Sequence, residues 1–75
     1  PEQALPAMRP ERIVRVLLKC GLTLKHQTGS HAILTRPGLR RPVVVAMHNR
    51  ELPARIVRDI VQQAGLTIAE FREHV

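Results

Sequence analysis

Residues 22–46 decide the fold, and they read LTLKHQTGSHAILTRPGLRRPVVVA. Three stretches rich in β-forming residues, 22–27, 31–35 and 42–46, are separated by short segments of turn-forming residues. The first separator is Thr28-Gly29-Ser30, and the second, Arg36 to Arg40, contains the Pro-Gly pair of a tight turn. This spacing predicts a three-stranded antiparallel meander, whose first strand alternates apolar and polar residues as a half-buried strand does.

Helical patterns lie on both sides of the strands. Apolar residues recur at helical spacing from Pro10 to Gly21, a glycine typical of a helix end. A second apolar stripe follows Pro53 and ends at Gly65. The next segment, 67–70, has the spacing of a capping box, which predicts a short third helix carrying Phe71.

The predicted order is α-β-β-β-α with a short extra C-terminal helix. This is an α+β fold in which a three-stranded antiparallel meander carries both main helices on one face, the architecture of double-stranded-RNA-binding domains. A chain of 75 residues forms a single domain. We expect residues 8–75 to form it and residues 1–7, with two prolines and little periodicity, to be a flexible N-terminal arm.

The charge of the chain favours a polyanionic partner. Twelve Lys and Arg against six Asp and Glu leave a net charge of +6, which makes nucleic acid the leading partner. An acidic protein partner, or a domain that is simply basic, is the alternative. Phe71 is the sole aromatic residue, so the chain has no platform for stacking single-stranded bases, and contacts to the nucleic-acid backbone are favoured.

Cysteine usage and hydropathy bear on the compartment. Cys20 is the single cysteine, which excludes a disulfide framework and a cysteine-based zinc knuckle; we expect it to be a small core residue. No apolar run reaches transmembrane length and none resembles a signal sequence. We therefore expect a cytoplasmic protein with no membrane partner.

The exposed side of the first predicted helix carries Arg12, Arg15 and Lys19. These cations fit two interpretations, an ordinary solvated helix face or one side of a nucleic-acid footprint. Periodicity does not separate the two.

His31 is the sharpest candidate for chemistry. It follows Gly29 and Ser30 at the mouth of a predicted strand, where a glycine lets a phosphate approach the backbone and a hydroxyl can donate to it. An imidazole at this position could take the proton of an RNA 2′-OH. The alternative for His31 is a polar residue at a strand edge.

Several basic residues near the predicted strands are candidate phosphate contacts. This chemistry also needs a donor for the negative charge that grows on the phosphate. The candidate helpers, which join Gly29 and Ser30 as predicted RNA-binding residues, are Lys25, His26, Arg40, Arg41 and Arg50.

The remaining histidines are weaker candidates. His48 lies on the loop after the third strand, where it is either a general acid and RNA contact or a solvated loop residue. His74 lies near a terminus, and we expect no catalytic role for it. The sequence has no HExxH motif and no cysteine pair, so we expect no metal site and no cofactor.

The segment from Arg9 to Phe71 resembles the HicA (YcfA-like) family of mRNA interferase toxins. The resemblance rests on a helix ending in glycine, a strand, Gly29-Ser30-His31 and a Pro-Gly turn. It continues through residues 43–48, 51–53 and 59–67, which are similar to the third strand, polar loop, second helix and final glycine turn of the family.

The resemblance implies an RNA endonuclease whose catalytic residue is His31, on a double-stranded-RNA-binding-like fold. It also implies mRNA as substrate and a HicB-like antitoxin that masks the histidine. DNA binding would belong to the complex with the antitoxin and not to this chain alone. Two positions depart from the family pattern: Ala32 stands where many members have a second histidine or a basic residue, and Ala46 replaces a frequent proline.

The sequence thus favours a toxin that cleaves RNA without a metal, by histidine-assisted attack of the 2′-OH. Two other readings stay open. One is a non-catalytic RNA-binding module in which His31 only contacts phosphate or a 2′-OH. The other is an interaction protein whose basic face serves an acidic partner.

Overall fold

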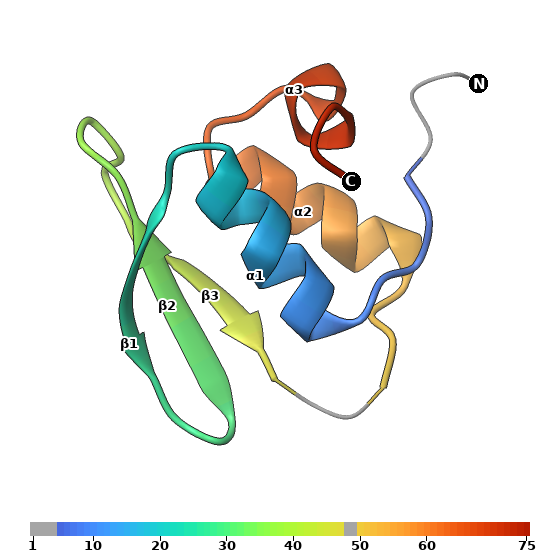
Figure 1. Cartoon of the computed structure of the whole chain (residues 1–75), viewed down its shortest axis with the longest axis horizontal. Coiled ribbons are helices and arrows are strands. Elements are labelled where there is room, and N and C mark those ends of the chain that lie inside the picture. Colours follow the sequence, from blue (N-terminus) through green and yellow to red (C-terminus); the bar gives the residue numbers. More distant parts are fainter. Residues whose placement is uncertain (1–4, 48–49) are drawn as a thin grey trace.

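The computed structural model describes residues 5–47 and 50–75. It confirms the predicted α-β-β-β-α order with a short C-terminal helix (Figure 1). The elements are α1 (Pro10–Lys19), β1 (Thr23–Gln27), β2 (His31–Thr35), β3 (Val43–Ala46), α2 (Ala54–Gln63) and α3 (Ile68–Arg72).

The three strands form an antiparallel sheet in the order β1-β2-β3. Ala32 and Leu34 of β2 are fully buried, as are their partners Val45 and Val43 in β3. Because side chains alternate along a strand, these four residues define an inner face, which α1 and α2 cover (Figure 1). The opposite, outer face of the sheet has no described helix packed on it.

The first strand departs from the predicted half-buried pattern. All five residues of β1 are exposed, including Leu24 at 37%, whereas Leu22, just before the strand, is 4% exposed. The prediction of a half-buried strand was wrong because β1 lies at the edge of the sheet, beyond the area that the helices cover. A β-bulge between Leu24 and His26 also shifts its register against β2.

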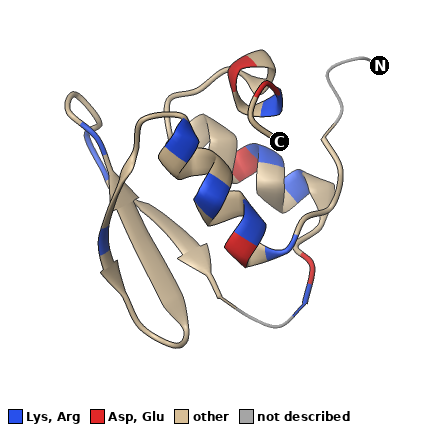
Figure 2. Ribbon diagram, viewed as in Figure 1, with Lys and Arg blue, Asp and Glu red and all other residues tan. Residues whose placement is uncertain are grey.

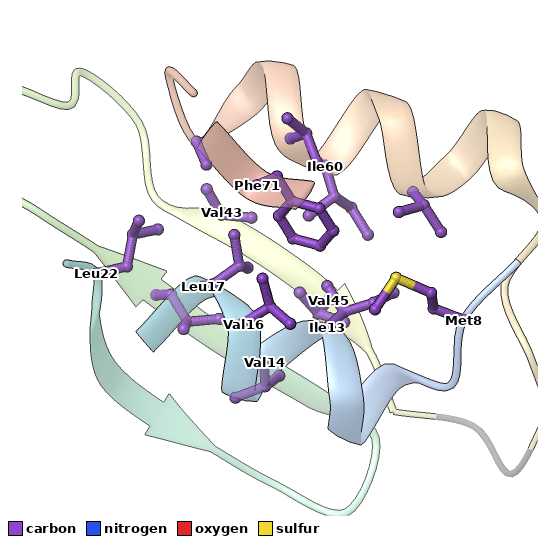
Figure 3. Packing of buried hydrophobic residues seen from close by; sticks show 14 of the residues in the cluster. Met8, Ile13, Val14, Val16, Leu17, Leu22, Val43, Val45, Ile60 and Phe71 are labelled. Carbon is purple, nitrogen blue, oxygen red and sulfur yellow. The ribbon is translucent and has the colours of Figure 1, made fainter. Parts of the chain in front are cut away.

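The core lies between the inner face of the sheet and the helices (Figure 3). Phe71 of α3 is 0% exposed and is the largest fully buried side chain of the described chain. Leu5, within the segment expected to be a flexible arm, is 7% exposed and belongs to the same core. Two backbone hydrogen bonds between Met8 and Leu52 join the segments that precede α1 and α2.

The ends of the helices follow the signals in the sequence. Gly21 and Gly65 have positive φ angles, 101° and 72°, which glycine adopts without steric cost after a helix. Thr67 and Glu70 form the predicted capping box at the start of α3. The backbone N–H of Thr67 donates a hydrogen bond to the Glu70 carboxylate, and this bond lowers the pKa of Glu70.

Cys20 follows α1 and is half-buried against the core. Its Sγ lies 3.9 Å from the carbonyl oxygen of Glu70. Burial, assisted by the nearby charge of Glu70, raises the pKa of the Cys20 thiol. The thiol is therefore protonated at neutral pH.

Candidate functional site

The β1–β2 hairpin presents His31 at its tip. The backbone N–H of Thr28 donates to the His31 carbonyl oxygen at 2.8 Å, which closes the loop. The Thr28 hydroxyl accepts hydrogen bonds from the backbone N–H groups of Ser30 at 3.1 Å and of His31 at 3.0 Å. At the same tip, the Met47 N–H donates to the Ser30 carbonyl oxygen at 2.7 Å, which joins the loop to the end of β3. The position of the His31 backbone is thus fixed from several sides.

Three polar groups at this tip have no partner among the described residues. They are the backbone N–H of Gly29, the hydroxyl of Ser30 and the imidazole of His31, and all three residues are exposed. Two donors and a titratable base are therefore close together along the chain and open to a ligand. An N–H and a hydroxyl can bind phosphate oxygens, and an imidazole can accept a proton near neutral pH.

The fold itself does not require glycine at position 29. Gly29 has no positive φ, and a Cβ built there would meet nothing within 4 Å. A glycine that neither the backbone conformation nor the packing demands leaves room for close approach to the main chain.

The β-bulge places a second histidine on the same face as His31. Across the two strands, Thr23 is paired with Thr35 and His26 with Ile33. Ile33 lies two residues after His31 on β2, so it shares the face of His31. Without the bulge, strict alternation would have put His26 on the inner face with Leu24. His26 and His31 are instead diagonal neighbours on the outer face, a separation of about 7–8 Å between Cα atoms in ordinary sheets.

Apolar side chains surround the two histidines on the outer face. Ile33 and Ala46 are half-buried, and Val44 is 48% exposed. Ala46 is paired with His31 and Val44 with Ile33. The outer face therefore combines an apolar centre with imidazoles at the hairpin end.

The other predicted site residues are not all brought to the hairpin. Arg40 and Arg41 lie in the β2–β3 connection, at the opposite end of the five-residue strand β2 from His31. There they line a separate hollow with Leu39, Pro42 and Gln63. A strand of this length spans about 13–17 Å, so a ligand at His31 reaches these arginines only if it is several nucleotides long.

Lys25 and Arg50 lie nearer the hairpin end. Lys25 is the extra residue of the bulge, beside His26, and Arg50 belongs to the connection that leaves the same end after β3. Both side chains are exposed. His48, the candidate general acid, lies outside the described residues.

Thr28 is the site residue that the sequence reasoning missed. Its hydroxyl organises the turn by accepting from two successive backbone N–H groups. Threonine directly after a strand and before Gly-Ser is a recognisable signal for such a side-chain turn.

The described residues contain neither a cluster of potential metal ligands nor a helix long enough to span a membrane. Within residues 5–47 and 50–75, no group of three or more His, Cys, Asp or Glu side chains is arranged to hold a metal ion. No helix in the described part of the chain has the length and apolar character needed to cross a bilayer.

Comparison with known proteins gives one family. Residues 10–66 of the 75-residue chain match a family model described as the HicA toxin of bacterial toxin–antitoxin systems. The match runs from the start of α1 to the segment after α2 and includes the whole hairpin. No curated protein matches the chain significantly.

Proposed function

Since the chain belongs to the HicA family of bacterial toxins, we propose that it acts as an mRNA interferase, an endoribonuclease that cleaves RNA with His31. The toxin role and the existence of an antitoxin partner follow from the family. The observation that carries the catalytic proposal is the hairpin tip, where Thr28 fixes the backbone of an exposed His31. Two donors beside it have no partner in the part of the chain that the structure describes.

The proposed reaction begins with proton abstraction by the neutral imidazole of His31 from a ribose 2′-OH. The 2′-oxygen then attacks the adjacent phosphorus, and the bond from phosphorus to the 5′-oxygen breaks. A proton transferred to the departing 5′-oxygen completes the step. The products are one RNA end with a 2′,3′-cyclic phosphate and one with a 5′-OH.

Donors at the hairpin would stabilise the negative charge that develops on the phosphate. The Gly29 N–H and the Ser30 hydroxyl are the nearest along the chain, and the open space beside Gly29 supports close approach of a phosphate. His26 and Lys25 are the cationic or polar groups of the neighbouring strand. His26 shares the outer face with His31, which makes it a candidate to contact the same phosphate or its neighbour.

The proposed partners follow from the same family. The antitoxin would be HicB-like and would cover the His31 face, and mRNA as substrate places the action in the cytoplasm. The α+β layout supports a likeness to double-stranded-RNA-binding domains. DNA binding would require the antitoxin.

Incubation of the purified chain with a long RNA tests this proposal. We expect cleavage that is unchanged by excess EDTA, because attack by the 2′-OH needs no metal. Fragments should carry 2′,3′-cyclic phosphate and 5′-OH ends, identified by mass spectrometry. Cleavage that EDTA stops, or fragments with 5′-phosphate ends, would contradict the mechanism. RNA binding without any cleavage would assign the chain to the non-catalytic RNA-binding modules.

Replacing Thr28 with valine should slow cleavage about tenfold, equivalent to about 1.4 kcal/mol in the barrier. Valine has a similar shape but accepts no hydrogen bond, so the N–H groups of Ser30 and His31 lose their acceptor. Thr28→Ser keeps the hydroxyl and should retain most of the wild-type rate. We expect the loss in kcat and not in KM, because the Thr28 hydroxyl positions the backbone of the base through these two hydrogen bonds. Equal rates for the valine and serine variants would show that the hydroxyl does not act through His31.

A further inference from the structure

The exposed side of α1 carries three cations in one line. Arg12, Arg15 and Lys19 are spaced by three and four residues, which places them on the same side of a helix. A rise of about 1.5 Å per residue distributes their backbone positions over about 10 Å of helix axis. Figure 2 shows this line of basic residues on α1. We refer to Arg12, Arg15 and Lys19 as the α1 stripe.

The cations of the α1 stripe have no counterion among residues 5–47 and 50–75. Within the described residues, none of their side chains has a hydrogen-bond or ion-pair partner. All three also line one hollow of about 280 Å³, together with Val16, His74 and Val75. The lining of this hollow contains no Asp or Glu.

The neighbouring hollow provides a comparison within the same helix. It is lined by Glu11 and Glu51 as well as by Arg9, Arg12 and Arg15. Acidic and basic side chains are mixed there, whereas the side chains that line the hollow along the α1 stripe include cations and no carboxylate. Of these two hollows on α1, the one beside Lys19 and His74 is therefore the more favourable for an anion.

The position of α1 relates the stripe to the hairpin. Figure 1 shows α1 beginning at the end of the sheet where the β1–β2 hairpin lies and running toward the β2–β3 connection. The start of the helix is held there by the bonds between Met8 and Leu52. The α1 stripe thus leads away from the end of the molecule that carries His31.

We propose that the α1 stripe is a second contact surface for RNA, which binds the phosphates of nucleotides beside those at the hairpin. This inference rests on the proposed ribonuclease function and adds to it a binding surface outside the His31 hairpin. The ligand is a polyanion with regularly spaced charges, and each strand of a nucleic-acid helix advances about 3.4 Å per nucleotide. The α1 stripe, about 10 Å long, is therefore about three nucleotide steps in length and can contact three consecutive phosphates.

The test compares two triple variants, both built on His31→Ala so that RNA is bound and not cleaved. The first changes Arg12, Arg15 and Lys19 to alanine. The control changes Arg55, Arg58 and Arg72 to alanine, which removes three exposed helical charges elsewhere. Alanine favours helix, so both proteins should retain the helical circular dichroism of the parent. Affinity for a labelled single-stranded RNA is measured between about 50 and 200 mM salt, because affinity that depends on phosphate contacts changes strongly over this range.

The expected result is a change in salt dependence confined to the α1 stripe variant. Each phosphate contact to a single strand contributes about 0.7 to the slope of log affinity against log salt, so losing three contacts lowers the slope by about 2. The control triple should lower it by less than about 0.7, one contact. An equal decrease of the slope in both variants, or no decrease in the α1 stripe variant, would overturn the proposal. The α1 stripe would then contact a protein partner or solvent.

This experiment separates the inference from the proposed function. If wild-type protein cleaves RNA while the α1 stripe variant binds it like the control, the proposed binding surface is wrong and the proposed ribonuclease function is supported. If the α1 stripe is needed for binding but wild-type protein never cleaves, the binding surface is supported and the ribonuclease function is wrong. Loss of RNA binding in the His31→Ala parent itself would overturn the inference, since the stripe would then hold no RNA on its own.

Discussion

Replacing His31 with alanine is expected to lower the rate of RNA cleavage by about 10²- to 10⁴-fold, the usual contribution of a general base. The side chain is exposed at the hairpin tip and has no partner among the described residues. Its removal should therefore change the free energy of unfolding by no more than about 0.5 kcal/mol. The change should act on the chemical step and not on the fold.

Two further variants make this test specific to proton transfer. His31→Gln keeps a polar group that can contact phosphate but cannot act as a base near neutral pH. It should bind RNA nearly as well as wild type and cleave as poorly as the alanine variant. Thr35→Ala alters the same strand at its other end, four residues from His31, and should cleave at the wild-type rate. Rates are read from single-turnover assays with protein in excess of RNA.

Normal cleavage by a folded His31→Ala protein would remove His31 from the mechanism. A glutamine variant that cleaves as fast as wild type would have a similar consequence, because it would reduce His31 to a phosphate contact. In either case the base would have to be sought elsewhere on the outer face, where His26 is the nearest imidazole in the strand register.

Phe71→Ala should lower the free energy of unfolding by about 3–5 kcal/mol, the range for truncating a buried aromatic side chain. The ring comes from the short helix α3 and is 0% exposed in the core shared by the helices and the sheet (Figure 3). Stability of about 0.05–0.15 kcal/mol per residue amounts to about 4–11 kcal/mol for this chain. The variant should therefore be marginally folded, and its urea midpoint should fall by about a quarter or more.

Leu18→Ala is the matched control for this prediction. Leu18 is an apolar residue of a helix but is 41% exposed, so its truncation should change stability by about 0.5 kcal/mol at most. Urea denaturation followed by circular dichroism measures both variants. Similar losses for the two would show that α3 does not seal the core as the structure describes.

Much of the fold was predictable because the local signals agree with one another. Pro10, Gly21, Gly65 and the capping box at Thr67 mark helix ends, and each is used as the sequence indicates. The strands at 31–35 and 43–46 have the predicted positions to within one residue at each end. Burial alternates along both strands, because every second side chain points toward the helices.

The first strand was less predictable because its environment depends on distant parts of the chain. Alternation in residues 22–25 indicates burial, but only the packing of α1 decides how far the covered area extends. The bulge is likewise a property of the pairing with β2 and leaves no clear mark on the sequence of β1. It reverses the expected face of His26, so the juxtaposition of His26 and His31 required the structure.

The candidate site likewise has residues that local sequence identifies and residues whose positions depend on the fold. His31 was identifiable because Gly-Ser-His at a strand entrance is a local pattern, and the hairpin keeps those residues together. Arg40 and Arg41 lie at the far end because successive connections of a meander alternate between the two ends of a sheet. Distances between side chains do not follow from composition, so charge alone could not separate the cations near His31 from those far from it.

The bulge in β1 also bears on how copies of the protein behave at high concentration. An edge strand offers unpaired backbone groups to which another sheet can add, and irregular pairing or a lysine on the edge discourages such addition. β1 has both features, since Lys25 is the extra residue of the bulge. β3, the other edge strand, has neither, and its residues 43–46 are Val-Val-Val-Ala. Sheet-to-sheet aggregation would therefore begin at β3, and the net charge of +6 acts against it through mutual repulsion between molecules.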